Sequence, residues 1–201
     1  MAPEPRVAFF DHLAEHWDGW EDLDTLPGRL DRALEDFGVA PGERVLEVGC
    51  GTGNLTLALT RRLGAEGRVF AVDCSPKMLA RARTKVADPR VTWIQAAVQE
   101  LPPEPRDLDR AILMGVWPHL DAKGQVLDLL HRRLRPGAGL HIWHLASRRE
   151  INETHAKAHA AVAGDVLEPA RDLSALLEAH GFEVLAARDD ETQHSVSARR
   201  A

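Results

Sequence analysis

The sequence predicts a doubly wound α/β fold, in which a mostly parallel sheet lies between layers of helices. Short apolar runs of strand length alternate along the chain with segments whose apolar residues recur at helical spacing. The first run, Val45–Val48, leads into Gly49, Gly51 and Gly53, and a helical pattern begins near Leu55. A strand, a glycine turn and a helix start in this order are typical of the nucleotide-binding corner of such folds.

The size and composition of the chain fit a single soluble α/β domain. It has 201 residues, of which 44% are hydrophobic and 28% charged, and its net charge is −6. The acidic balance disfavours non-specific binding to nucleic acid or to an anionic membrane. No apolar run is long enough to span a bilayer, and the N-terminal residues lack the apolar core of a signal peptide. We therefore expect a cytoplasmic protein, a monomer or a homodimer, with no nucleic-acid or membrane partner.

The other elements follow in order, each recognised by its period and its end signals. Gly38 and Gly64 follow two of the helices, as glycine commonly does at a helix C-terminus, and Ser75 with Pro76 caps the start of another. The expected strands are 45–48, 68–73, 91–95, 109–115, 140–145, 182–187 and 193–198. The expected helices are 6–20, 26–37, 54–63, 76–86, 121–134, one that starts after Ser147, and 169–180.

The second strand ends in an acidic residue at a meaningful distance from the glycines. Asp73 lies twenty residues after Gly53. A carboxylate at this offset is placed to accept hydrogen bonds from the ribose hydroxyls of a bound nucleoside. The dinucleotide fingerprint G-x-G-x-x-G would need glycine at position 54, where the chain has Asn54. The corner therefore fits a nucleoside cofactor better than a dinucleotide.

The run E-V-G-C-G-T-G at positions 47–53 resembles the first motif of the class I S-adenosylmethionine (SAM) methyltransferases. The resemblance covers about residues 6–200 and is most specific over 45–79. It implies a Rossmann-like sheet of seven strands with an antiparallel last strand and helices on both faces. It also implies that SAM is the cofactor, bound by Glu47, Gly49, Cys50, Gly51, Gly53, Asp73, Cys74, Met78, Ala97, Val98 and Met114.

One position departs from the pattern of that family. Many relatives have G-D-A-x-x-L-P after the third strand, where the Asp accepts from the adenine amino group. Ala97 stands at the matching position here. The adenine contact at this point is therefore expected to be apolar and backbone-mediated.

The N-terminal segment F-F-D-x-L-A-x-x-W-D is similar to a helix that precedes the domain in small-molecule methyltransferases and covers the cofactor and substrate. On this resemblance residues 1–40 form a helical lid, and Trp17 contacts the substrate. The alternative is a helix that only packs on the sheet. The two interpretations stay open at the level of sequence.

One histidine follows the fourth strand and another ends the fifth, where a parallel sheet presents its functional edge. His119 and His144 are candidate catalytic residues, because a histidine there could act as a general base. The segment 147–180 inserts helices after the fifth strand. It begins with the capping box Ser147–Glu150, and its first helix offers Arg148 and Asn152 as candidate substrate-binding residues.

The same helix suggests a metal site as a second hypothesis. His155, with His159 as a fourth candidate, lies on one polar stripe with Arg148 and could converge with His119 and His144. Three imidazoles with open positions would suit zinc or a related divalent metal. The alternative is a solvated helix face, which is the commoner reason for such a stripe.

The sequence therefore predicts a SAM-dependent methyltransferase that acts on a small-molecule acceptor. The chain is one domain over residues 1–201, with no added peptide- or nucleic-acid-recognition module. The alternatives are a SAM-binding protein that performs a different reaction, a protein with a histidine-lined metal site that handles a metal-bound substrate, and a methyltransferase acting on protein or RNA. Fold alone does not decide among these chemistries.

Overall fold

The computed structural model of this protein describes residues 4–20 and 22–201. The chain divides into two compact units, and the division falls after Leu101. The first unit contains the glycine loop, and the second contains the histidines that follow the fourth and fifth strands.

The first unit is built on three parallel strands in the order β3-β2-β1. β1 pairs with β2 from Arg44 opposite Arg68, and β2 pairs with β3 from Val69 opposite Val91. Its elements are α1 (Pro5–Leu13), η1 (Trp17–Trp20), α2 (Leu26–Asp36), β1 (Arg44–Val48), α3 (Asn54–Arg62), β2 (Arg68–Asp73), α4 (Pro76–Lys85), β3 (Val91–Gln95) and η2 (Val98–Glu100).

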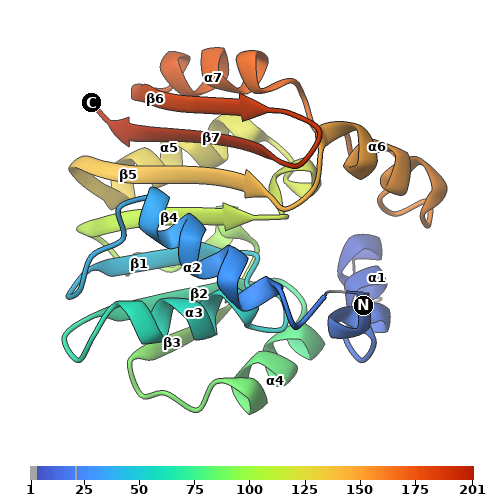
Figure 1. Cartoon of the computed structure of the whole chain (residues 1–201), viewed down its shortest axis with the longest axis horizontal. Coiled ribbons are helices and arrows are strands. Elements are labelled where there is room, and N and C mark those ends of the chain that lie inside the picture. The colour runs from blue at the N-terminus through green and yellow to red at the C-terminus, as the bar shows by residue number, and fades with distance from the viewer. Residues whose placement is uncertain (1–3, 21) are drawn as a thin grey trace. The chain divides into compact units, whose positions relative to one another are not determined.

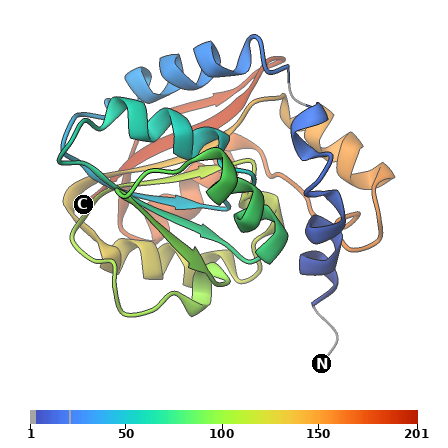
Figure 2. The ribbon, with the colours of Figure 1, turned by 90° about the horizontal axis from the view of Figure 1, so that it is seen from below.

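Helix packing in this unit follows from amphipathic helices that bury their leucine faces. α2 packs against α3, and α3 packs on β2. Leu34, Leu55 and Leu59 are all fully buried. Figure 2 shows α2 and α3 side by side on one side of β1 and β2, while α1 lies apart from them, beyond the ends of these strands. The carboxyl ends of β1, β2 and β3 therefore point to the side of this unit on which α1 lies.

The second unit is built on four strands in the order β4-β5-β7-β6. β4 and β5 are parallel, whereas β7 runs antiparallel to both β5 and β6. α7 packs on β6, and α6 lies beyond the carboxyl end of β5 (Figure 1). Its elements are β4 (Leu108–Met114), η3 (Trp117–His119), α5 (Lys123–Arg133), β5 (Leu134–His144), α6 (Arg148–Lys157), α7 (Ala170–Ala179), β6 (Phe182–Asp189) and β7 (His194–Arg200).

These strands confirm the predicted fold class, a seven-stranded and mostly parallel sheet with an antiparallel last strand. The strands at 68–73 and 91–95 begin and end at the predicted residues. The capping box at Ser147 is also present, with bonds in both directions between Ser147 and Glu150. In residues 4–20 and 22–201 no helix is long and apolar enough to cross a membrane.

Several predicted boundaries were wrong by one or more residues, and three of them have a reason that the structure shows. The N-terminal helix ends at Leu13 instead of near position 20, because the chain turns there and Trp17–Trp20 form a separate 3-10 helix. Helix α5 starts at Lys123, since Ala122 has a φ of 48° and a left-handed residue cannot continue a helix. Strand β5 starts at Leu134, which pairs with Leu108 before an irregularity in the register.

Candidate functional site

The glycine loop in the first unit is shaped by positive backbone angles and by one carboxylate. Gly49, Gly51 and Gly53 have φ values of 71°, 52° and 86°. The backbone N–H of Gly51 donates to Asp73 Oδ2 at 2.8 Å, and that of Ser75 donates to Asp73 Oδ1 at 2.9 Å. Asp73 therefore joins the loop after β1 to the start of α4.

The tight fit of the loop against α4 can be tested at Gly53. A Cβ on Gly53 would lie 3.1 Å from Ala82 Cβ and 3.2 Å from Ala82 Cα. We expect Gly53→Ala to lower the free energy of unfolding by about 2 kcal/mol, from the left-handed backbone and the crowding together. Gly28→Ala is the matched control in urea unfolding. A Cβ on Gly28 meets nothing within 4 Å, so this helix substitution should stabilise instead. Equal effects would contradict the prediction.

Glu47 lies under this loop as a buried carboxyl group. Only 2% of the residue is exposed, and Oε2 accepts a hydrogen bond of 2.6 Å from Thr56 Oγ1. Burial raises the pKa of Glu47 to about 8, and the Thr56 hydrogen bond opposes this only in part. The charge of Asp73 also raises this pKa. Glu47 is therefore protonated in the folded protein at neutral pH when the corner holds no cation.

Glu47 should make stability depend on pH. The unfolded carboxyl loses its proton near pH 4.5, and the folded one near pH 8. The folded state holds the extra proton between these values, so stability falls as pH rises through the window. We expect Glu47→Gln to remove this fall and to be more stable than the wild type at pH 9 by roughly 2–4 kcal/mol. Urea unfolding at pH 5, 7 and 9 checks it, with Glu66→Gln at an exposed position as the control. A gain that does not grow with pH would contradict the prediction.

The other predicted cofactor residues occupy three kinds of position. Cys50 is buried, Cys74 is half-buried, and burial raises the pKa of both thiols, that of Cys74 to about 11. Both are therefore ordinary thiols at neutral pH. Met78 is buried on the inner face of α4. Ala97 and Val98 follow β3: Ala97 precedes η2, and Val98 is buried. Met114 is half-buried at the end of β4, in the second unit.

The N-terminal segment contacts the same corner from α1 and η1. Trp17 Nε1 lies 3.9 Å from the position that a Cβ on Gly51 would take. Its ring packs edge-on against Phe10 and Trp20, at centroid distances of 5.9 and 5.7 Å. Asp11 Oδ1 accepts from Ser75 Oγ at 2.5 Å and from the backbone of Lys77 at 3.2 Å. The sequence did not predict these carboxylate contacts.

The second unit brings His119 and an acidic residue together. His119 Nδ1 lies 2.6 Å from Asp165 Oδ2, and both side chains are about nine-tenths buried. His155 Nδ1 donates to the backbone carbonyl of Asp165 at 2.8 Å. The rings of His119 and His155 are 4.7 Å apart. Donation from Nδ1 to a carboxylate leaves Nε2 of His119 as the basic nitrogen of the ring.

Two polar anchors hold the segment that carries Asp165. Asn152 uses both ends of its amide on the backbone of Leu167, at 3.0 and 2.8 Å. Glu168 accepts from Trp117 Nε1 at 2.7 Å and from Lys123 Nζ at 3.0 Å. These bonds tie the segment to α6 on one side and to η3 and α5 on the other. Asp165 is thereby fixed beside His119.

His144 is buried at the end of β5 next to His194, the first residue of β7. The two rings are 5.7 Å apart, and neither nitrogen of His144 has a hydrogen-bond partner among the described residues. Burial, together with a smaller effect of the neighbouring histidines, lowers the pKa of His144 to about 3. His144 is therefore a neutral imidazole, in contrast to the hydrogen-bonded ring of His119.

The described residues give no support to the predicted metal site. In the part of the chain that the structure describes, no three His, Cys, Asp or Glu side chains lie where they could share a metal ion. The Nδ1 atoms of His119 and His155 are used on Asp165, and His159 lies beyond the end of α6, where its Nδ1 accepts from the backbone of Ala161. The polar stripe of α6 thus ends before His159, because the helix ends at Lys157. The histidine that does lie on this stripe, His155, makes its hydrogen bond within the protein.

The remaining substrate-binding candidate, Arg148, is in an ion pair. Its Nε donates to Asp189 Oδ2 at 2.9 Å, and Asp189 also accepts from the backbone of Ala170. Arg148 and Asn152 thus both stabilise the insert, and their predicted contact with the substrate stays a prediction. Asp165, Asp11 and Asp18, which carry much of the polar geometry, were missed because each meets its partner across a long stretch of sequence.

The corner around Gly49–Gly53 and Asp73 defines the class of protein: an α/β fold that binds a nucleoside cofactor. Comparison with known proteins agrees. Residues 45–137 match the model of a methyltransferase domain family. The chain is 32% identical over 138 residues to a 2-phytyl-1,4-naphthoquinone methyltransferase of Trichormus variabilis, covering 65% of this chain and 60% of that protein. It is 31% identical over 153 residues to a ubiquinone/menaquinone biosynthesis C-methyltransferase of Vibrio vulnificus, covering 70% and 58%.

The fold comparison gives the same result over nearly the whole chain. The crystal structure of a SAM-dependent methyltransferase from Aquifex aeolicus matches with a TM-score of 0.77 at 20% identity, over 95% of this chain and 98% of that one. The family match, the relatives and this fold together support a class I SAM-dependent methyltransferase. It spans about 60% of the length of the quinone methyltransferases that it matches, so their substrates are a starting point for a proposal.

Proposed function

We propose that this protein transfers the methyl group of SAM to a small-molecule acceptor that carries an ionisable hydroxyl group. The observation that supports it most is the buried pair of His119 and Asp165, 2.6 Å apart. Methyl transfer needs a nucleophile in line with the S–CH₃ bond, and SAM supplies the leaving group. The protein must supply a base only if the acceptor atom still holds its proton. A histidine oriented by a carboxylate would be redundant for an acceptor that is already ionised.

The substrate class follows from this base and from the named relatives. One of them is a 2-phytyl-1,4-naphthoquinone methyltransferase, and another is a C-methyltransferase of ubiquinone and menaquinone biosynthesis. The reduced ring of a quinone carries hydroxyl groups. Nε2 of His119 would take the hydroxyl proton, and Asp165 would stabilise the imidazolium. The electron pair that is freed makes the oxygen, or the ring carbon beside it, nucleophilic. A new bond forms from that atom to the methyl carbon as the S–CH₃ bond breaks, and S-adenosylhomocysteine leaves. Where carbon is the acceptor, its hydrogen then leaves as a proton to water and the ring becomes aromatic again. We therefore propose a phenol or a hydroquinone as the acceptor.

The role of SAM in this proposal rests on the first unit. Three glycines leave room for the cofactor to approach bare backbone, and Asp73 stands where ribose hydroxyls are bound in such folds. Only the ionised form of Glu47 would attract the positive charge of the cofactor. SAM should therefore lower the pKa of Glu47 and release a proton when it binds.

The proposal is tested by binding and then by transfer. Calorimetry with SAM and with S-adenosylhomocysteine should give saturable binding, and either ligand should raise Tm. SAM labelled in its methyl group is then incubated with 1,4-naphthohydroquinone under reducing conditions, and label is counted in the organic extract. Label in the extract supports the proposal. Binding of SAM followed by its breakdown without label transfer would indicate a different reaction, and absence of SAM binding would refute the cofactor assignment.

A further inference from the structure

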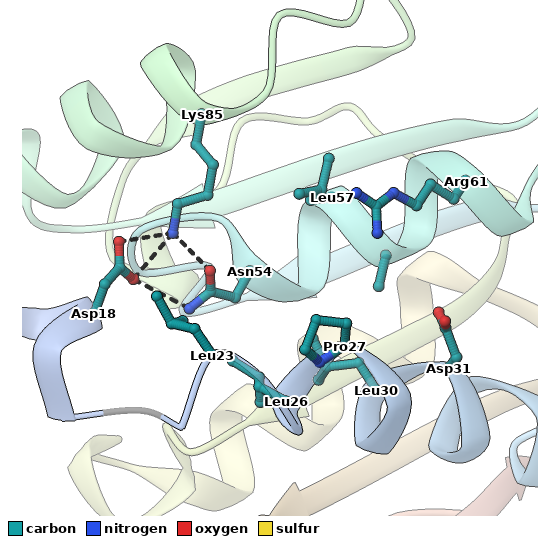
Figure 3. Close-up of a pocket in the computed structure, with 11 residues that line it drawn as sticks. Asp18, Leu23, Leu26, Pro27, Leu30, Asp31, Asn54, Leu57, Arg61 and Lys85 are labelled. Atoms are coloured by element: carbon teal, nitrogen blue, oxygen red, sulfur yellow. Dashed lines mark hydrogen bonds and ion pairs between the residues drawn. The ribbon is translucent and has the colours of Figure 1, made fainter.

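Asp18 is the centre of a four-residue polar network on the glycine loop. Its Oδ1 accepts from Thr52 Oγ1 at 2.6 Å and from Asn54 Nδ2 at 3.1 Å. Lys85 Nζ donates to both carboxylate oxygens at 2.9 Å, and also to Thr52 Oγ1 at 3.1 Å and Asn54 Oδ1 at 2.6 Å. Figure 3 shows Asp18, Asn54 and Lys85 converging at one end of a cavity of about 230 Å³.

The network joins three separate pieces of chain. Asp18 belongs to η1, Thr52 lies in the loop between β1 and α3, Asn54 is the first residue of α3, and Lys85 is the last residue of α4. Thr52 and Asn54 are the two neighbours of Gly53, whose φ is 86°. Asp18 thus binds the loop on both sides of its last glycine, whereas Asp73 binds it at Gly51.

The charges of this network are partly shielded from water. The side chains of Asp18 and Lys85 are 20% and 24% exposed. Burial raises the pKa of Asp18, but the hydrogen bonds from Thr52 and Lys85 outweigh it, and the net shift is downward. Asp18 is therefore ionised at neutral pH, and its hydrogen bonds to Thr52 and Asn54 are charge-assisted.

We propose that Asp18 is a positioning residue for the cofactor, because it holds Thr52 and Asn54, and with them the glycine loop, in the conformation that binds SAM. The inference rests on the proposed function, since it concerns the same cofactor. A loop with three glycines has more backbone freedom to lose than the same loop built from other residues. A carboxylate that already restricts it lowers the ordering cost of binding, and the affinity rises accordingly. Asp18 itself need not touch SAM.

The network also explains why the N-terminal segment lies on this corner. Asp11 contacts the first turn of α4, and Asp18 contacts its last residue, so the segment is held at both ends of one helix. Trp17, between the two, lies beside Gly51. The geometry therefore predicts that loosening Asp18 also loosens Trp17 and speeds the loss of bound cofactor.

The test compares cofactor binding in matched variants of the full chain. Asp18→Ala removes both carboxylate acceptors of the network, and we expect its Kd for SAM to rise about ten-fold to a hundred-fold. Asp18→Asn keeps one acceptor oxygen and should fall between Asp18→Ala and the wild type. Asp31→Asn is the control, because Asp31 lines the same cavity and loses the same charge but makes no bond to the loop. Calorimetry is run at a temperature where circular dichroism shows each variant folded, and the SAM dissociation rate is measured by stopped flow.

A second variant keeps the test decisive if Asp18→Ala does not fold. Thr52→Val has nearly the same shape and removes only one partner of Asp18, so its Kd for SAM should rise several-fold. If the folded variants bind SAM with a Kd within two-fold of wild type, the inference is overturned. The proposed function stays intact in that case, as long as the wild type binds SAM. A wild type that binds neither SAM nor S-adenosylhomocysteine would overturn both. The inference would also be overturned if Asp31→Asn raised the Kd for SAM as much as Asp18→Ala does. Loss of one negative charge would then be enough to explain the weaker binding.

Discussion

Replacing His119 by glutamine is expected to lower kcat for methyl transfer to a hydroquinone by about 100-fold or more, while Kd for SAM stays within two-fold of wild type. The reason is the loss of the general base, whose contribution is about 10²–10⁴-fold in rate. Glutamine keeps a hydrogen-bonding group of similar length but cannot take up a proton at neutral pH. The measurement is the rate of label transfer from SAM under saturating cofactor, with calorimetry to confirm that the cofactor still binds.

The control for this prediction is a second histidine–aspartate pair in the same unit. His180 Nδ1 lies 2.7 Å from Asp128 Oδ1, the same arrangement as His119 and Asp165, but Asp128 is 52% exposed. His180→Gln should leave kcat unchanged. Asp165→Asn should lower kcat as a positioning change, because the amide can no longer accept from Nδ1–H with a full charge. A full rate in His119→Gln would show that the acceptor arrives already ionised.

The sheet was predictable because strand patterns are local. The run Arg68–Asp73 carries its own signals, an apolar core and an acidic end, and the structure places its ends at the same residues. The glycine loop was predictable for the same reason, since positive backbone angles require glycine there. The end of the first helix was not predictable in this way. The aromatic spacing of Phe10 and Trp17 continues past Leu13, where the helix ends. The contact of Asp18 with Thr52, which goes with the turn, joins residues far apart in the sequence.

The polar part of the candidate site was harder to predict. Asp165 lies 46 residues from His119, in a segment without helical or strand period, and it is placed by the bonds of Asn152 and His155. His119 and His155 lie side by side, with ring centroids 4.7 Å apart. The metal hypothesis gains no support, because no three His, Cys, Asp or Glu side chains in the described residues could share an ion. In each of the two rings Nδ1 bonds to Asp165, which fixes the orientation of the ring.

Replacing Asp73 by alanine is expected to weaken SAM binding by about 100-fold or more. The carboxylate already accepts from Gly51 and Ser75, but each carboxylate oxygen has a further lone pair for a ribose hydroxyl. Burial raises the pKa of Asp73, and the two backbone N–H groups oppose the rise. Loss of the carboxylate removes about two charge-assisted hydrogen bonds to the cofactor, each contributing roughly 1.5–3 kcal/mol.

The same substitution also frees the backbone of Gly51, so stability and affinity must be separated. Asp73→Asn serves this purpose. Its amide oxygen can still accept from one backbone N–H, but its NH₂ group faces the other donor, so Tm without ligand should fall in both variants. Calorimetry with S-adenosylhomocysteine at a temperature where both are folded isolates the binding loss. Adenosine gives the last discrimination, because it shares the ribose and lacks the methionine end. If Asp73 binds the ribose, its substitution should lower the affinity for adenosine by the same factor as the affinity for S-adenosylhomocysteine. An unchanged affinity for adenosine would show that the carboxylate only holds the loop.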